Sequence, residues 1–291
     1  MDAFGAKCKE SNNPGRTVSM EVANYPKLKN AILLCLLIII LQIIIGLIAG
    51  IFSSITGISE HSPTLGIILS TVQILSFGIP LYIGWINTKK PFNEVFNFKK
   101  VNLDSWIYTI IFSTGFIIVS SEIDNFFKML VPMPYYFDEI FGVFLNNDNL
   151  IIAIFLTGVI PAFIEEMTFR GLFISGFRIN YSAKKTILFS ALLFGIIHLN
   201  PWQFITAFIV GLVTGWIFLK SNSIILCVFI HFFNNTMFLL ANRFENFIPV
   251  PGFNPNVASP NNHQPWWFNA MGISIAVIGL ILLKRSFRKK F

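Results

Sequence analysis

Charged residues are scarce in this chain. Asp, Glu, Lys and Arg make up 12% of the 291 residues, whereas they approach about a quarter of an average soluble domain, and 54% of the residues are hydrophobic. This balance excludes an ordinary soluble domain and indicates an integral membrane protein. The formal net charge is +7, but the basic residues fall in short clusters between apolar runs, so nothing indicates nucleic-acid binding.

Cysteine is also rare. The three residues Cys8, Cys35 and Cys227 have no metal-ligand spacing, and their odd number provides no disulfide framework. We interpret them as packing or surface thiols. The sequence also lacks an internal repeat and a glycine pattern typical of nucleotide binding.

Eight apolar runs are candidates for membrane helices, since about 20 residues are needed to cross a hydrocarbon core of ~30 Å. Their approximate ranges are 30–53, 64–87, 105–121, 149–176, 185–200, 202–220, 223–242 and 266–283. Little more than Asn200 and Pro201 separates the fifth run from the sixth, so a count of seven spans stays open. The prediction is an all-α polytopic bundle of about eight transmembrane helices.

The polar residues 1–29 predict a cytoplasmic arm, and residues 30–291 predict a single transmembrane domain. All but two of the 21 Lys and Arg residues fall in this arm, around alternate connections or in the C-terminal tail; the exceptions are Lys128 and Arg243. Because cytoplasmic loops carry the excess of basic residues, we expect both termini in the cytoplasm and an even number of spans. The abundance of Asn, Lys, Ile and Phe without an organelle-targeting arm indicates a bacterial cell membrane.

Two glycine pairs have the spacing that permits close contact between membrane helices. They are Gly46 with Gly50 and Gly211 with Gly215. We expect both pairs to pack inside one bundle and not to form a dimer.

Two adjacent carboxylates, Glu165 and Glu166, lie inside the fourth apolar run. A charge at the centre of a membrane helix costs roughly 2.5–3.5 kcal/mol, so this pair marks a functional site by default. On a helix, Glu166 shares a face with Arg170, and Glu165 points about 100° away. An ion pair of Glu166 with Arg170 would leave Glu165 free for proton transfer; a purely structural ion pair is the alternative. Because Pro161 frees the carbonyl of Thr157, we also expect a kink there that admits water or substrate backbone.

Two histidines and an asparagine follow in later runs. His198 ends the fifth run one helical turn after Phe194, and His231 lies near the middle of the seventh with Asn235 one turn on. Taken singly, His198 would be an interfacial residue at a helix end, and His231 with Asn235 would join helices by hydrogen bonds. Together with Glu165 they are the parts that amide hydrolysis requires, namely a proton acceptor for water and donors for the oxyanion.

The ordered motifs Glu165-Glu166-xxx-Arg170, Phe194-xxx-His198 and His231-xxx-Asn235 resemble the signature of the CPBP family, the CAAX-protease and bacteriocin-processing (Abi) intramembrane endopeptidases. The resemblance covers about residues 149–242, the expected catalytic core. It implies a helical bundle with an active-site cavity in the membrane, open to the cytoplasm. It also implies that Glu165 and His198 activate the water and that His231 and Asn235 supply the oxyanion donors. Glu166, Arg170 and Phe194 are then supporting residues.

The depth of His198 conflicts with this arrangement. In the topology above it approaches the outer end of a short fifth span, whereas Glu165 is at mid-span. We therefore expect the fifth span to begin deeper in the membrane or to tilt.

Two other hypotheses stay open beside a protease without a cofactor. In the first, Zn²⁺ is bound by ligands from Glu165, Glu166, His198 and His231, although the sequence has no His-Glu-x-x-His helix. In the second, the chain is a non-catalytic membrane protein, such as an immunity factor or a scaffold, that retains the motif residues.

The expected partners are the lipid bilayer and a peptide or small membrane-protein substrate. A cavity open to the cytoplasm suits a hydrophobic, lipidated or leader peptide. Since bacteria generally lack prenylated CAAX proteins, we favour the processing of a small secreted peptide or the maturation of a membrane peptide.

Overall fold

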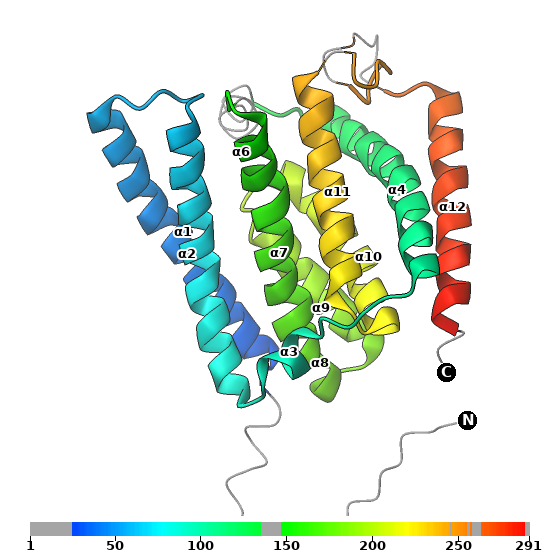
Figure 1. Cartoon of the computed structure of the whole chain (residues 1–291), viewed down its shortest axis with the longest axis horizontal. Coiled ribbons are helices and arrows are strands. Elements are labelled where there is room, and N and C mark those ends of the chain that lie inside the picture. Colours follow the sequence, from blue (N-terminus) through cyan, green and yellow to red (C-terminus); the bar gives the residue numbers. More distant parts are fainter. Residues whose placement is uncertain (1–24, 135–146, 245, 255–256, 258–262, 289–291) are drawn as a thin grey trace, which may run out of the picture.

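The computed structural model describes residues 25–134, 147–244, 246–254, 257 and 263–288. All the long elements in these residues are helices, which pack side by side in one bundle (Figure 1). The β structure recorded in these ranges is an isolated bridge between Pro251 and Asn254. The predicted all-α polytopic fold is confirmed.

The long helices follow the predicted apolar runs. They are α1 Leu28–Thr56, α2 Pro63–Thr88, α4 Leu103–Leu130, α9 Ala183–Ile196, α10 Pro201–Ser221, α11 Ile224–Arg243 and α12 Trp266–Arg288. The short helix α3 Phe92–Phe96 joins α2 to α4. The fourth run forms one continuous stretch, Leu150–Asn180, which we call the composite helix. Its segments are α6 Leu150–Ile154, the π-helix η2 Phe155–Val159, α7 Ile160–Glu166, the π-helix η3 Met167–Ile174 and α8 Ser175–Asn180.

Seven of these helical stretches are long and apolar enough to cross a membrane, so the chain is a multi-pass membrane protein. The remaining predicted span is α9, which has only 14 residues. At 1.5 Å per residue it rises about 21 Å, less than the ~30 Å of the hydrocarbon core. His198 lies in the turn after α9, two residues beyond its end at Ile196. That this span begins deeper in the membrane or tilts stays a prediction.

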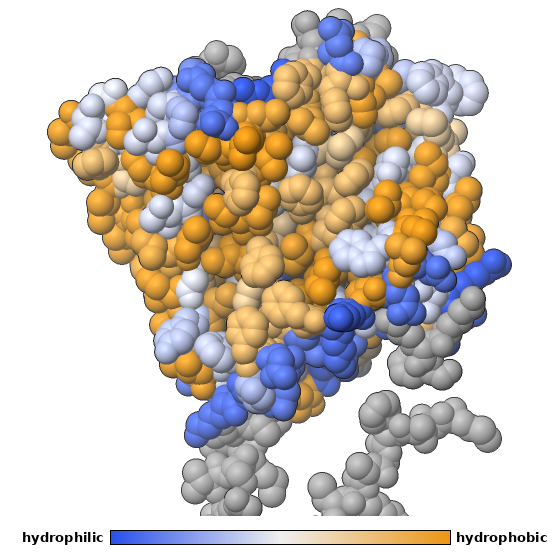
Figure 2. All heavy atoms as spheres, in the orientation of Figure 1, coloured by the Kyte–Doolittle hydropathy of each residue, from blue (hydrophilic) through white to orange (hydrophobic). Residues whose placement is uncertain are grey.

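The two ends of the bundle differ in charge. Helix α1 begins and α12 ends at the same end, at the bottom of Figure 1, which agrees with an even number of passes. This basic end carries Lys27, Lys29, Lys89, Lys90, Lys99, Lys100, Arg178, Lys184, Lys185, Lys220, Lys284, Arg285 and Arg288. Figure 2 shows hydrophilic residues there, below a broad apolar band. That the basic end faces the cytoplasm stays a prediction.

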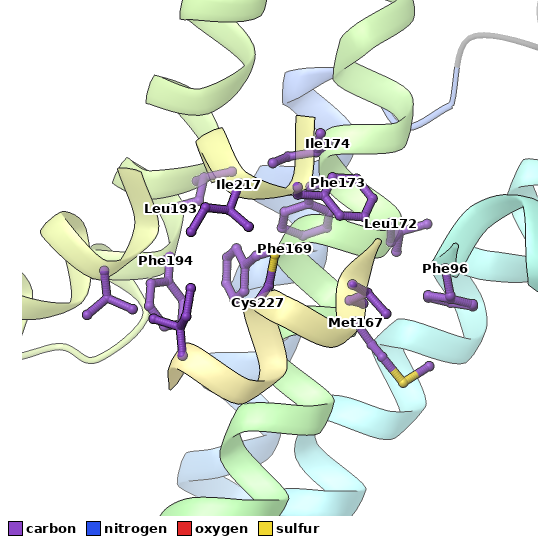
Figure 3. Packing of buried hydrophobic residues seen from close by; sticks show 14 of the residues in the cluster. Phe96, Met167, Phe169, Leu172, Phe173, Ile174, Leu193, Phe194, Ile217 and Cys227 are labelled. Carbon is purple, nitrogen blue, oxygen red and sulfur yellow. The ribbon is translucent and has the colours of Figure 1, made fainter. Parts of the chain in front are cut away.

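The apolar core surrounds the π-helix η3. All eight of its residues are buried, and its aromatic side chains pack against α9, α10 and α11 (Figure 3). The ring of Phe169 lies edge-on to those of Phe173 and Phe194, with centroids 5.2 and 5.1 Å away. The segment that follows the two glutamates is therefore the most enclosed part of the bundle.

The two glycine pairs behave differently. A Cβ on Gly211 would lie 2.9 Å from the Cα of Ala191, so this pair lets α10 approach α9 closely, as predicted. Among the described residues, a Cβ on Gly46 or Gly50 would meet no atom of another element within 4 Å. The expectation of packing inside the bundle is therefore wrong for Gly46 and Gly50, because this half of α1 extends away from the other described helices.

The division into an arm and a transmembrane domain stays a prediction. Residues 1–24 of the predicted arm lie outside the described residues, as does Cys8. Cys35 and Cys227 are buried free thiols, which agrees with a packing role. Of the last arm residues, Pro26 lies directly against Gly176 of α8, so the chain is already packed on the bundle before α1 begins.

Candidate functional site

The two glutamates end α7, between the π-helical segments η2 and η3. In a π-helix each backbone bond spans five residues instead of four, which widens the turn, and such segments are frequent at functional sites. Both carboxyl side chains point inward, with Glu165 6% exposed and Glu166 fully buried. The local backbone thus presents two carboxylates to the interior of the bundle.

Glu166 forms the predicted ion pair with Arg170. The carboxylate Oε1 lies 2.9 Å from Nη1 of Arg170, and both side chains are fully buried. The same Oε1 is 3.0 Å from Nδ1 of His231 on α11. Glu166 is therefore held from its own helix and from a neighbouring one.

Arg170 lies in the interior, so counting it with the basic residues of a cytoplasmic connection was wrong. Its guanidinium carbon is 4.5 Å from the ring centroid of Phe194, within the range of a cation–π contact. Within the described chain, Nε, Nη1 and Nη2 of Arg170 make no contact with the geometry of a hydrogen bond. The charge is thus compensated by proximity to Glu166 and by the face of an aromatic ring.

The two oxygens of Glu165 have different surroundings. Oε1 accepts a hydrogen bond from the side-chain amide of Gln73 on α2, at 3.2 Å. Oε2 is buried, makes no hydrogen bond to any described residue, and lies 3.9 Å from Nε2 of His231. One carboxylate oxygen is therefore restrained, and the other faces an imidazole nitrogen without a bond.

Asn235 and Pro161 meet at the start of α7. Pro161 has no N–H, so the carbonyl of Thr157 loses the donor that a regular helix would supply. The side-chain amide of Asn235 donates to this carbonyl at 2.9 Å. The prediction that this carbonyl would be open to water or substrate backbone is wrong, since a side chain from α11 already occupies it.

His198 lies in the turn after α9, and Phe194 connects it to the other groups. Nδ1 of His198 is 2.8 Å from the backbone carbonyl of Phe194, and because a carbonyl only accepts, Nδ1 carries the hydrogen. The Phe194 ring lies edge-on to both imidazoles, with centroids 5.2 Å from His198 and 5.6 Å from His231. No hydrogen bond or ion pair joins His198 to Glu165 among the described residues. His198 is instead connected to Glu165 through the Phe194 ring and His231.

Gln73 is the residue that the sequence analysis missed. It belongs to the second apolar run, outside the three motifs, and its contact with Glu165 spans 92 positions in the chain. The available signal was a carboxamide within an otherwise apolar membrane helix, where polar side chains usually have a partner.

The zinc hypothesis requires several ligand side chains that converge on one point. No group of three or more His, Cys, Asp and Glu side chains in the described parts of the chain is arranged to hold a metal ion. Oε1 of Glu166 is engaged by Arg170 and His231, and His198 stands apart from the carboxylates. The four residues do not form a ligand set in this arrangement.

Comparison with known families agrees with the resemblance in the motifs. Residues 147–237 match the family model described as type II CAAX prenyl endopeptidase Rce1-like, which lies within the CPBP family. The matched residues contain all three motifs, and the match indicates an intramembrane protease. No curated protein and no solved structure matches the chain.

Proposed function

We propose, from the Rce1-like domain at residues 147–237, that the chain is an intramembrane endopeptidase in which a glutamate activates water. The observation that carries this proposal is the state of Glu165. Its Oε2 is buried, has no hydrogen-bond partner among the described residues and faces His231 at 3.9 Å. A carboxylate oxygen in such a place is suited to accept a proton from a water molecule.

The charges of the cluster support this assignment. Glu165 and Glu166 as carboxylates, with Arg170 as a cation, sum to one negative charge. The role of oxyanion donor requires a hydrogen on Nε2 of His231 as well as on Nδ1, and with both hydrogens the charges sum to zero. In that state Nδ1 donates to Glu166, and Nε2 carries a hydrogen toward the space beside Glu165.

His231 then acts as an oxyanion donor through Nε2. Asn235 is the second donor, because its amide has two hydrogens and only one is used on Thr157. Hydrogen-bond donors held in place before the reaction stabilise the charge of a tetrahedral intermediate, and removing one typically lowers kcat by about 100-fold or more. The bond to Thr157 keeps the Asn235 side chain in a fixed orientation.

His198 assists in holding the water. Its Nδ1 hydrogen is used on the carbonyl of Phe194, so Nε2 of the neutral ring is an acceptor. This arrangement orients the imidazole without involving either carboxylate.

The reaction proceeds in two steps. Oε2 of Glu165 takes a proton from water while the water oxygen bonds to the carbonyl carbon of the peptide, forming the oxyanion. The intermediate then collapses, the carbon–nitrogen bond breaks, and Glu165 returns the proton to the leaving amine. The carboxylate is regenerated, and the products are a carboxylic acid and an amine.

The substrate that we propose is a peptide or small membrane protein held at the bilayer. The description of the matched family names a prenyl endopeptidase, and the site lies among membrane helices, so a hydrophobic, lipidated or leader peptide is the class of choice. Within that class we favour a small secreted or membrane peptide. No cofactor is required for the steps above.

The test is cleavage of a panel of fluorogenic lipidated and leader peptides by the purified protein in liposomes. Glu165→Gln keeps the size of the side chain and removes the base, so we expect its rate to fall by at least about 100-fold. Glu60→Gln, at an exposed residue between α1 and α2, is the matched control and should cleave normally. All variants are assayed with and without a strong chelator.

Each outcome separates the hypotheses. Cleavage that is lost in Glu165→Gln and indifferent to the chelator supports the glutamate mechanism. Loss on chelation, restored by Zn²⁺, would favour the metal hypothesis, and full activity of Glu165→Gln would refute the role of this residue. If no peptide is cleaved, a cellular phenotype that survives Glu165→Gln would identify a non-catalytic protein.

A further inference from the structure

We infer that Gln73 on α2 is a positioning residue for Glu165, which holds one carboxylate oxygen so that the other, Oε2, receives the proton from water. This inference rests on the proposed function. It extends the site to a helix outside the matched residues 147–237. The observation behind it is the hydrogen bond from Nε2 of Gln73 to Oε1 of Glu165, at 3.2 Å.

A carboxylate needs such a restraint. The terminal torsion of a glutamate side chain is broad, so the two oxygens exchange places at little cost unless one of them is bound. Gln73 supplies the hydrogen bond that Glu165 makes within the described structure. Because the amide binds Oε1, Oε2 is left toward Nε2 of His231.

The absence of charge on Gln73 suits this role. The titratable groups nearest to Glu165 are His231 from α11 and, on the composite helix, Glu166 and Arg170. The group that α2 presents to Glu165 is the neutral amide of Gln73. A cation there would pair with Glu165 and weaken it as a base, and a second carboxylate would repel it.

The packing of α2 explains why Gln73 is aimed at the site. Phe77, Pro80 and Gly84 follow Gln73 at helical spacing and are buried. Gly84 lies directly against Leu172 of η3, and Gly78 is near Ile164 of α7. Close contact along this face of α2 brings the amide to the end of α7.

The alternative is that Gln73 only joins two helices in the membrane. A joining residue contributes to the amount and stability of folded protein. A positioning residue changes the rate of the chemical step and leaves substrate binding nearly unchanged. These effects are separable in the reconstituted enzyme.

The main variant is Gln73→Met, which has nearly the same shape and no donor. Thr71→Val is the matched control, since Thr71 lies in the same turn and, within the described structure, its hydroxyl bonds only the backbone of its own helix, at Ile67. We expect Gln73→Met to lower kcat about tenfold, the order expected for a hydrogen bond to a charged group, with KM changed less than about twofold. Thr71→Val should leave both constants unchanged.

Partial rescue by a conservative variant is the second measurement. Gln73→Asn keeps the amide on a shorter side chain, so its kcat should lie between those of wild type and Gln73→Met.

Wild-type kcat in Gln73→Met, with Glu165→Gln inactive, would overturn the inference and leave the proposed function intact. Loss of folded protein in both Gln73→Met and Gln73→Asn would overturn it in favour of a joining residue. Full activity of Glu165→Gln would instead overturn the proposed function, and this role of Gln73 with it.

Discussion

The side-chain amide of Asn235 takes the place of the backbone N–H that Pro161 lacks, by donating to the carbonyl of Thr157 at 2.9 Å. This bond spans 78 positions and ties α11 to the junction between η2 and α7. A proline inside a membrane helix leaves an acceptor that lipid cannot satisfy, and here a side chain from a neighbouring helix satisfies it. Asn235 therefore has a structural role, as the donor to the Thr157 carbonyl, besides the catalytic role that we propose.

Asn235→Ala should lower both stability and activity, because the carbonyl of Thr157 would lose its side-chain donor. We expect a loss of about 1–3 kcal/mol of unfolding free energy, the cost of an unsatisfied buried polar group. The neighbouring Asn234→Ala is the control, since among the described residues the side chain of Asn234 accepts only a long contact of 3.5 Å from Ser120. Thermal unfolding in detergent and peptide cleavage measure the two effects. Wild-type stability of Asn235→Ala would contradict the structural role.

Arg170→Ala should reduce the yield of folded protein, because it leaves Glu166 as a buried carboxylate without its cation. Breaking a buried ion pair by removing one partner typically costs about 3–5 kcal/mol. Replacing both partners, as in Glu166→Gln with Arg170→Met, should restore much of the yield, since no unpaired charge remains. Purified yield and unfolding temperature are the measurements. A double variant less stable than Arg170→Ala would disprove this account.

Gly171→Ala should destabilise the bundle, because the new Cβ would lie 2.5 Å from Cδ1 of Phe96. Overpacking of this kind typically costs about 1–3 kcal/mol. The double variant Gly171→Ala with Phe96→Leu replaces the ring by a smaller side chain. It should recover part of the lost stability, because the new Cβ and the Phe96 ring would otherwise overlap. Gly46→Ala is the matched control, and it should be neutral because nothing lies within 4 Å of its Cβ. Equal stability of the two single variants would argue against the packing described for α3.

The orientation of the bundle is predicted from its basic end. In a cysteine-depleted background, Lys184→Cys and Glu60→Cys place single thiols at exposed positions at opposite ends. If the basic end faces the cytoplasm, a membrane-impermeant maleimide added to intact cells should label Glu60→Cys and not Lys184→Cys. The opposite labelling would reverse the topology, and it would place the basic residues outside against the usual bias.

Much of this fold follows from local features of the sequence. Apolar runs near 20 residues long predicted the spans, because the thickness of the bilayer sets the length of a helix that crosses it. The ion pair of Glu166 with Arg170 was predictable for a similar reason, since residues four apart on one helix are neighbours whatever the rest of the chain does. The motifs also lie within residues 147–237, which match the Rce1-like family model.

The contacts between helices were not predictable in this way. Gln73 meets Glu165 across 92 positions, and His231 meets Glu166 across 65. Glycine spacing was equally ambiguous, since Gly211 packs against α9 while Gly46 packs against nothing within 4 Å. Each of these depends on how one helix is rotated against another, which is decided by packing over the whole interface.

The sequence by itself therefore determined that the chain is a membrane bundle and where most of its helices run, because these depend on hydrophobic length and helical period. Only the tertiary structure decided which oxygen of Glu165 is left free, which donor satisfies Thr157 and which helix supplies Gln73. These contacts form where α2, α11 and the segment around α7 meet. The spacing of residues along one helix does not tell how a neighbouring helix is rotated about its own axis.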